Sequence, residues 1–321
     1  MSGCGEIEIE PSPQLDTAKS LYEAVDKDMK YALDKAADAA VRVVKRLEPQ
    51  LWNPNNNEPL YLSIQPDSAG IKGDVRDVIC LRKQNGWEIG FSCKHNHHAV
   101  KHSRLSDTID FGKEWLDIPC STEYFDVVVP LFSELRRFRD DSKENGTPML
   151  WESIDNKAER YYKPILEAFM KELKRIADKN KGTPERLIRY LLGRNDFYKV
   201  ITEDKSRTTR VEAINIAGTL NCNSGDEKPI TKVPILKMPT QFYHIGFKQD
   251  SDNTIEVVCD EGWQISMRIH NASSKVEPSL KFDVQLISFP SSVYAQVEPW
   301  DSEEERMVNR VSAYADKLIK R

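Results

Sequence analysis

Apolar residues recur first at helical and later at strand spacing, and this change divides the chain into three segments. Residues 16–48 carry a stripe of helical spacing that predicts one long amphipathic helix ending before Pro49, with its stripe in the core. The stripe consists of Leu21, Val25, Met29, Leu33, Ala37, Val41 and Val44. We expect a helix and a core region in residues 1–123, a helical insert in residues 124–198 and a β-rich region in residues 199–321.

The insert and the β-rich region give more detailed expectations. Apolar stripes predict helices over residues 124–139 and 164–177, and Thr183 with Pro184 predicts the start of a helix that ends at Gly193. Five later runs predict strands. They are Arg210–Ile216, Gln241–Lys248, Thr254–Cys259, Trp263–Asn271 and Leu280–Phe289.

A β-hairpin is predicted in the first segment. The runs Val75–Leu81 and Trp87–Ser92 flank Asn85-Gly86, and Asn-Gly between β-branched and aromatic residues is a strong hairpin signal. The run Tyr61–Ile64 alternates and predicts a preceding strand.

The register of this hairpin decides which side chains meet. If the Asn-Gly pair alone forms the loop, Asp77 lies opposite Lys94. Ile79 then lies opposite Ser92. Because side chains alternate between the faces of a strand, Asp77 and Lys94 point to one side. Glu88 and Ser92 share that side.

An acid and a lysine on one strand face are the groups that metal-dependent hydrolysis of phosphodiester bonds requires. Carboxylates hold Mg²⁺ ions, which activate water and take up charge on the leaving oxygen. A lysine can stabilise the transition state or orient the attacking water. Asp74 joins this set if a β-bulge turns it to the same face. The alternative is a surface hairpin whose acid and lysine form a cross-strand ion pair worth about 0.2–1 kcal/mol.

Four stretches carry a more specific resemblance. They are Ile71–Val78, Ser92–Ser106, Asp110–Leu116 and Gly262–Asp283. The hairpin resembles the PD-(D/E)XK nuclease core, and the four stretches together resemble the HaeIII family of type II restriction endonucleases. This resemblance implies an α/β fold of PD-(D/E)XK type, in which helices flank a mixed central sheet, with a helical insert and a β-rich C-terminal half that reads DNA.

The resemblance also implies a reaction and a catalytic set. The reaction is Mg²⁺-dependent cleavage of double-stranded DNA at GGCC, between the central G and C, to blunt ends. Asp77 and Lys94 match the nuclease pattern, but Ser92 stands where the pattern has a second carboxylate. Acids available to replace it are Asp74, Glu88 and, from the first helix, Glu23. We therefore expect catalytic roles for Asp77, Lys94, Glu88 and Asp74, with metal binding by Asp77, Asp74 and Glu88.

Residues that contact DNA are expected in two places. After the hairpin, Ala99–Leu116 has a helical pattern, and its Lys101 and Arg104 can clamp phosphates. In the β-rich half, Arg268 shares a strand face with Ser266 and His270, and arginine pairs with guanine in the major groove. The alternative for that face is a solvated surface with an ion-paired arginine. The full expected set is His95, Asn96, His98, Lys101, Arg104, Ser266, Arg268, His270, Asn271 and Lys281.

Charge is compatible with a DNA partner. The net charge is −5, but between Lys72 and Lys113 eight Lys or Arg stand against five Asp or Glu, together with four of the six histidines. The distribution matters more than the sum, although a mixed solvated surface has the same composition. The histidines of residues 95–102 can approach phosphates, act as acid or base, or bind zinc.

Composition also bounds the compartment. No window of about 18 apolar residues predicts a membrane span, and the N-terminus lacks the basic start and apolar core of a secretory signal. The six cysteines show no C-x-x-C spacing, which favours free thiols in a reducing cytoplasm over disulfides or structural zinc.

Two functions remain open from the sequence. One is a type II restriction endonuclease, and the other is a sequence-specific DNA-binding protein with a degenerate core that does not cleave, as Ser92 suggests. The oligomeric state also stays open, because a palindromic target suits either a homodimer or a monomer that acts twice.

Overall fold

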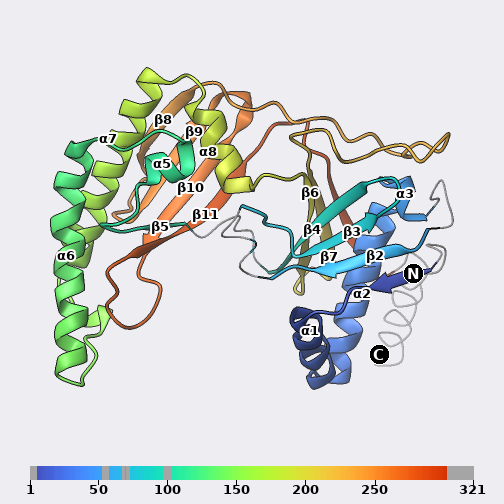
Figure 1. Ribbon diagram of the computed structural model, residues 1–321, viewed down its shortest axis with the longest axis horizontal. Helices are drawn as coiled ribbons and strands as arrows, with labels where there is room; N and C mark the ends of the chain where they lie inside the picture. The colour runs from blue at the N-terminus through green and yellow to red at the C-terminus, as the bar shows by residue number, and fades with distance from the viewer. Residues whose placement is uncertain (1–5, 53–57, 67–68, 70–72, 97–102, 302–321) are drawn as a thin grey trace, which may run out of the picture. The chain divides into compact units, whose positions relative to one another are not determined.

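The chain forms two compact units, each with its own sheet (Figure 1). The computed structural model describes residues 6–52, 58–66, 69, 73–96 and 103–301. The first unit comprises Met1–His97, Asn195–Leu236 and Ser292–Arg321, and the second comprises His98–Arg194 and Lys237–Ser291. The fold is mixed α/β, as predicted. The units do not follow three consecutive segments, because the chain leaves the first unit and returns to it twice.

A seven-stranded mixed sheet forms the first unit, in the order β1-β2-β3-β4-β6-β7-β12. Its strands are β1 (Ile7–Ile9), β2 (Leu60–Ile64), β3 (Val78–Arg82), β4 (Trp87–His95), β6 (Phe197–Glu203), β7 (Thr208–Ile214) and β12 (Ala295–Pro299). The strands β2, β3 and β4 pair antiparallel, and β6 runs parallel to β4. The strand and the hairpin predicted here are therefore confirmed.

Two helices replace the single long helix predicted at the N-terminus. They are α1 (Pro13–Ala24) and α2 (Lys27–Val44). Val25 between them is extended, and the Asp26 carboxylate accepts a hydrogen bond from the Met29 amide at 2.8 Å. A side chain that caps the first free amides starts a new helix, so Asp26 divides the predicted element.

The second half of α2 packs on one face of the first sheet. Val43 and Val44 are buried with Ile89 of β4 and Tyr198 of β6, and Leu51 of the short helix α3 (Pro49–Trp52) joins the same core. Burial of these apolar side chains against the sheet stabilises the helix.

The stripe predicted for the core is only partly buried. Leu21 of α1 is 66% exposed, and Met29 is 39% exposed. Leu33, Ala37 and Val41 line an apolar cavity of about 520 Å³ between α2 and the sheet. Leu33 and Ala37 are exposed as well, and Val44 is the one buried residue of the stripe, so the core prediction is wrong for most of it. The buried positions of α2 are instead Ala36, Ala39, Val43 and Val44.

An antiparallel five-stranded sheet and four helices form the second unit. The strands, in the order β5-β11-β10-β9-β8, are β5 (Arg104–Leu105), β8 (Phe242–Phe247), β9 (Thr254–Cys259), β10 (Gln264–His270) and β11 (Leu280–Ser288). The helices are α5 (Phe111–Leu116), α6 (Thr122–Glu144), α7 (Lys163–Lys179) and α8 (Thr183–Leu192). Short 3-10 helices at Trp151–Ser153 and Asp260–Gly262 and a π-helical turn at Ala158–Tyr162 complete it.

Most elements predicted in this unit are confirmed. The helices over residues 124–139 and 164–177 exist as α6 and α7, and the helix after Gly182 ends at Gly193 as predicted. Gly182 rather than Thr183 is its N-cap. The predicted helix over Ala99–Leu116 is wrong at Arg104, which lies on β5, because the distant β11 offers it a strand partner.

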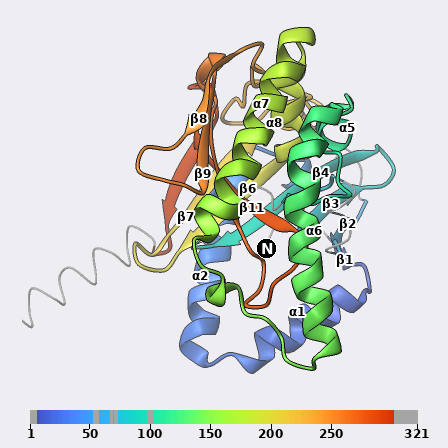
Figure 2. The same ribbon diagram turned by 90° about the vertical axis from the view of Figure 1, so that its left-hand side faces the viewer.

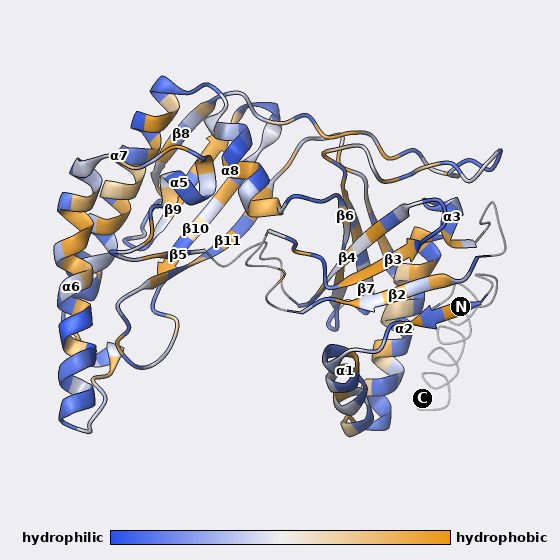
Figure 3. Cartoon of the chain, viewed as in Figure 1, coloured by the Kyte–Doolittle hydropathy of each residue, from blue (hydrophilic) through white to orange (hydrophobic). Residues whose placement is uncertain are grey.

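Aromatic side chains fill the core of the second unit. Phe111 of α5, Phe169 of α7 and Phe282 of β11 are fully buried, and their ring centroids follow one another at 4.5 and 5.3 Å. The helices α6 and α7 lie side by side (Figures 1 and 2). The last turns of α6 are polar (Figure 3), as expected for a helix end that leaves the core.

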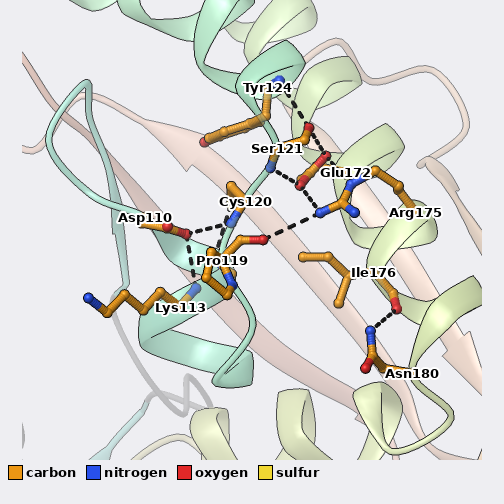
Figure 4. Close-up of polar contacts among 11 residues, drawn as sticks. Asp110, Lys113, Pro119, Cys120, Ser121, Tyr124, Glu172, Arg175, Ile176 and Asn180 are labelled. Carbon is orange, nitrogen blue, oxygen red and sulfur yellow. Dashed lines mark hydrogen bonds and ion pairs between the residues drawn. The ribbon is translucent and has the colours of Figure 1, made fainter.

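A buried glutamate joins the start of α6 to α7. The Ser121 amide and hydroxyl donate to Glu172 at 2.6 and 2.8 Å, and Arg175 pairs with Glu172 at 2.7 Å (Figure 4). Burial favours a higher pKa for Glu172, but the hydrogen bonds from Arg175 and Ser121 outweigh burial and hold the pKa below its usual value. The carboxylate is thus charged and satisfied inside the unit.

The five cysteines that the structure describes are free thiols, with Cys80 and Cys259 buried and Cys93 exposed. Over the described parts of the chain, no helix combines the length and the apolar character that a membrane crossing needs.

Candidate active site

The hairpin of β3 and β4 has a longer loop than predicted. Arg82 pairs with Trp87, so the four residues between them form the loop. Ile79 therefore pairs with Gly90 and not with Ser92, and the predicted register is wrong by two residues.

A shift of two residues keeps every side chain on its predicted face. The Asp77 amide donates to the Phe91 carbonyl at 2.7 Å, which extends the ladder and sets Asp77 opposite Ser92 instead of Lys94. Asp77 and Lys94 still share one face of the sheet. Glu88 shares it as well, so the face on which the site was predicted survives the correction.

The carboxylate of Asp77 gathers donors from β4. Its Oδ2 atom accepts from the Cys93 amide at 2.6 Å, from the Lys94 Nζ at 3.3 Å and from the Ser92 hydroxyl at 3.4 Å. The Asp77 side chain is 47% exposed and that of Lys94 is 25% exposed. The structure therefore brings together the acid and the lysine that the sequence singled out, with solvent access to both.

Asp74 and Glu88, the other two predicted acids, are bridged by a residue that the sequence did not single out. Arg76 donates from Nη2 to Asp74 at 2.7 Å and from Nη1 to Glu88 at 2.5 Å. Burial favours a higher pKa for Asp74, but the hydrogen bonds from Arg76 outweigh it and lower the pKa. The three acids expected around a metal therefore fall into two groups: Asp77 pairs with Lys94, and Asp74 and Glu88 pair with Arg76. The metal-binding roles of Asp74 and Glu88 stay predictions.

Two buried charges extend the row of side chains beyond Ser92. Lys199 of β6 pairs with Ser92 in the parallel ladder and with Glu212 of β7 on its other side. Burial lowers the pKa of Lys199, the neighbouring cations Lys94 and Arg210 lower it further, and Glu212 opposes them. Sequence reasoning missed Lys199 and Glu212, although a lysine among apolar residues of β6 was a usable signal.

The end of β4 is held by a second acid that the sequence did not single out. The Asp204 carboxylate lies 2.6 Å from His95 Nε2 and accepts from the Asn96 side-chain amide at 2.9 Å. These two hydrogen bonds lower the pKa of Asp204. His98 and Lys101 lie outside the described residues.

Predicted DNA-contacting residues of the second unit line up on one face of its sheet. Lys281 of β11 pairs with Arg104 of β5 on one side and with His270 of β10 on the other. The hydroxyl of Ser279 accepts from Arg104 at 3.1 Å. Basic side chains from three adjacent strands therefore point to the same side.

Arg268 continues this face and is ion-paired. It lies 3.3 Å from Asp283 of β11, and its side chain is 55% exposed. Ser266 is buried next to it, and the side-chain amide of Asn271 donates to the Lys275 carbonyl at 2.8 Å. Arg268 is thus exposed, as a DNA-contacting residue must be, and ion-paired, as the alternative of a solvated strand face expects.

The donor set around Asp77 suits a hard cation bound largely by water. Within the described ranges there is no group of three or more His, Cys, Asp or Glu side chains that could hold a metal ion. Mg²⁺ usually keeps several waters and takes one or two carboxylates with substrate phosphates, so Asp77 beside the Ser92 hydroxyl fits it. Glu23, the acid from the first helix that could replace the missing carboxylate, is exposed on α1.

The first unit carries an acid and a lysine beside each other on one face of a mixed sheet, and the sheet of the second unit presents a basic face. This combination is typical of a nuclease that recognises its substrate. Comparison with known proteins gives the particular family. The model of the HaeIII restriction endonuclease family matches residues 1–290. The chain is also 40% identical, over 296 residues, to the type II restriction enzyme HaeIII of Haemophilus aegyptius.

That alignment covers 92% of this chain and 91% of the relative. The chain belongs to the HaeIII restriction endonuclease family. It is a type II site-specific deoxyribonuclease, and such an enzyme binds double-stranded DNA. No solved structure matches the chain. Enzymes of this kind generally use a divalent metal ion.

Proposed function

We propose that Asp77 and Lys94 carry the hydrolysis of the DNA phosphodiester bond. The supporting observation is the 3.3 Å contact between Lys94 Nζ and Asp77 Oδ2 on a solvent-accessible sheet face. This contact adds little to stability by itself, since exposed ion pairs contribute about 0.2–1 kcal/mol. A phosphate that enters this place meets a cation and a carboxylate together.

In this proposal Asp77 would hold Mg²⁺. The ion would supply neutralisation of the phosphate charge and a water of lowered pKa. Lys94 donates to a non-bridging oxygen of the scissile phosphate and stabilises the charge that develops there. The Cys93 amide and the Ser92 hydroxyl orient the Asp77 carboxylate by donating to it.

We propose further that the basic face of the second unit reads a short site, GGCC, which is cut between G and C to blunt ends. Arg268 is the group best suited to guanine, because a guanidinium can pair with O6 and N7 together. Lys281 and Arg104 would hold the DNA backbone from the neighbouring strands. Such an enzyme acts in the cytoplasm, where free thiols such as those described here persist.

The test is plasmid cleavage with Mg²⁺, followed by sequencing of the product ends. The wild-type protein should give discrete fragments that end between G and C of GGCC. Asp77→Asn and Lys94→Gln should give none and yet shift the mobility of a GGCC duplex when Mg²⁺ is omitted. Lys83→Gln serves as the matched control, since Lys83 lies in the hairpin loop and pairs with Glu10 at 3.1 Å. Undiminished cutting by both site variants would show that the reaction occurs elsewhere.

A further inference from the structure

Arg76 occupies the segment that enters β3, one residue before Asp77. Its side chain is 8% exposed, and its guanidinium is fully engaged by two acids. Nε and Nη2 donate to the two oxygens of Asp74 at 2.8 and 2.7 Å, and Nη1 donates to Glu88 at 2.5 Å. Bidentate pairing of this kind fixes the direction of both partners as well as their distance.

The stem of Arg76 lies directly on Gly90 of β4. A Cβ atom built on Gly90 would overlap Arg76 Cδ and come within 2.6 Å of Cγ. A glycine is therefore required for this close approach. Gly90 is on the face of Ser92 and Lys94, so the arginine attaches the segment before β3 to the strand that carries the lysine.

The backbone on both sides of Arg76 is fixed by hydrogen bonds. The Arg76 amide donates to Asp74 Oδ1 at 3.2 Å, and the Asp77 amide donates to the Phe91 carbonyl at 2.7 Å. The direction in which the Asp77 carboxylate leaves the chain follows from these two anchors. The arginine also needs both acids, because a buried guanidinium that loses a carboxylate keeps its charge without compensation.

We propose that Arg76 is a positioning residue for the cleavage reaction. With Asp74 and Glu88 it fixes the segment before β3 against Gly90 and so holds the Asp77 carboxylate beside Lys94. Asp74 and Glu88 then act by holding Arg76, and metal binding rests on Asp77. This inference rests on the roles proposed above for Asp77 and Lys94.

The first test compares the rate of cleavage with the affinity for DNA. In single-turnover assays at saturating Mg²⁺, Arg76→Met and Gly90→Ala should each slow cleavage by about 100-fold, the effect of a displacement near 1 Å at the reacting groups. Affinity for a GGCC duplex without Mg²⁺ should stay close to that of the wild type, because Arg76 does not contact DNA in this proposal. Arg76→Lys keeps the charge and loses the bidentate pair, so its cleavage rate should lie between those of Arg76→Met and the wild type. Wild-type rates in both Arg76→Met and Gly90→Ala would overturn the proposal.

The second test is a double-mutant cycle that separates positioning from metal binding. If Asp74 serves only to hold Arg76, then Asp74→Asn with Arg76→Met cleaves no more slowly than Arg76→Met alone. If Arg76→Met does not fold, Glu88→Gln takes its place in the cycle with Asp74→Asn. Glu88 is the milder position to change, because its side chain is 46% exposed. Rates that multiply in the cycle would make the acids metal ligands and contradict the proposal.

The Asp77→Asn variant distinguishes a failure of the positioning role from a failure of the proposed active site. Loss of cleavage in Asp77→Asn together with wild-type rates in the arginine and glycine variants refutes only the positioning role. Retained cleavage in Asp77→Asn refutes the site itself, whatever the other variants do.

Discussion

Ser92 is the residue at which this chain departs from the nuclease pattern. Its hydroxyl lies 3.4 Å from Asp77 Oδ2, and it is buried between β3 and β6. A serine contributes at most a neutral oxygen to a cation, so the site offers one carboxylate where the pattern has two. Affinity for a hard cation increases with the number of charged ligands.

Ser92→Asp should therefore lower the Mg²⁺ concentration that gives half-maximal cleavage. In the absence of metal the new carboxylate lies beside Asp77, and repulsion between the two should lower the melting temperature. Added Mg²⁺ should then raise the melting temperature of Ser92→Asp more than that of the wild type. Ser92→Asn, which has the size of the aspartate without its charge, is the matched control and should not gain this additional stabilisation by Mg²⁺. An unchanged Mg²⁺ requirement in Ser92→Asp would place the metal away from this position.

The contact between Asp77 and Lys94 could be predicted from the sequence, and most of the residues around it could not. Asp77 and Lys94 are visible because an Asn-Gly turn and alternation place them on one face. Arg76, Lys199 and Asp204 depend on contacts that need the assembled sheet, namely a neighbour across a strand or a partner more than a hundred residues away. Lys199 left a signal as a lysine among apolar residues of β6, whereas the local sequences of Arg76 and Asp204 resemble those of ordinary strand ends.

At the scale of elements, the hairpin shows how tertiary contacts override a local turn preference. Asn-Gly alone favours a two-residue loop, but here the loop has four residues. Its Gln84 amide donates to Glu58 at 2.7 Å, and the Asn85 side chain donates to Gln50 at 3.2 Å. Neither partner lies in the hairpin, so no local pattern reveals the longer loop.

Strands with their own alternation were predictable, and boundaries that depend on a cap or a distant partner were not. The run over Thr254–Cys259 was predicted with its correct bounds because its apolar residues alternate. The division between α1 and α2 depends on one hydrogen bond at Asp26, which a continuous apolar stripe concealed.

This cap supports a prediction about helix stability. Asp26→Ala removes the acceptor for the Met29 amide at the start of α2, and a lost N-cap costs about 1 kcal/mol. Because α2 is part of the core, the melting temperature should fall. Ser12→Ala removes the matching cap of α1, which buries only Leu15, so helicity by circular dichroism should fall slightly while melting stays unchanged. Equal melting effects of the two variants would mean that α1 is as firmly packed as α2.

The basic face of the second sheet supports a prediction about recognition. Arg268→Ala should weaken binding to a GGCC duplex by about 1–3 kcal/mol and leave binding to random DNA nearly unchanged, because a base contact discriminates and a phosphate contact does not. The measurement is a titration of both duplexes without Mg²⁺. Arg189→Ala on α8, whose arginine pairs with Glu185 at 2.7 Å, is the control. Equal losses on both duplexes would make Arg268 a phosphate contact.

At the scale of the whole molecule, Glu48 of the first unit and Glu172 of the second unit are both buried, and the two respond to pH in opposite ways. In the first unit Glu48 is fully buried, and burial raises its pKa to about 7 against hydrogen bonds from Tyr198 and Asn221. In the second unit Arg175 and Ser121 outweigh the burial of Glu172 and lower its pKa. The folded first unit therefore favours the protonated form of its acid, and the folded second unit favours the ionised form of its own.

The sign of each effect follows from the protons bound in the two states. Between the usual value of 4.5 and about 7, folded Glu48 holds a proton that the unfolded chain has lost, so its contribution is complete below pH 4.5 and disappears as the pH rises through 7. The loss amounts to about 3 kcal/mol at 1.36 kcal/mol per pH unit. Folded Glu172 stabilises above pH 4.5, and its contribution is lost as the pH falls below its lowered pKa.

Glutamine variants should therefore separate with pH. Glu48→Gln keeps an acceptor for Tyr198 and has no charge to bury, so its melting temperature should increase relative to the wild type from pH 5 to pH 8. Glu172→Gln loses its ion pair with Arg175 and should melt below the wild type at pH 7, with the difference shrinking only as the pH falls below 4.5. Calorimetry of the three proteins from acidic pH to pH 8 measures both trends. A difference between Glu48→Gln and the wild type that does not vary with pH would show that Glu48 is already ionised in the folded protein, and the burial argument would then fail at the residue on which it depends most.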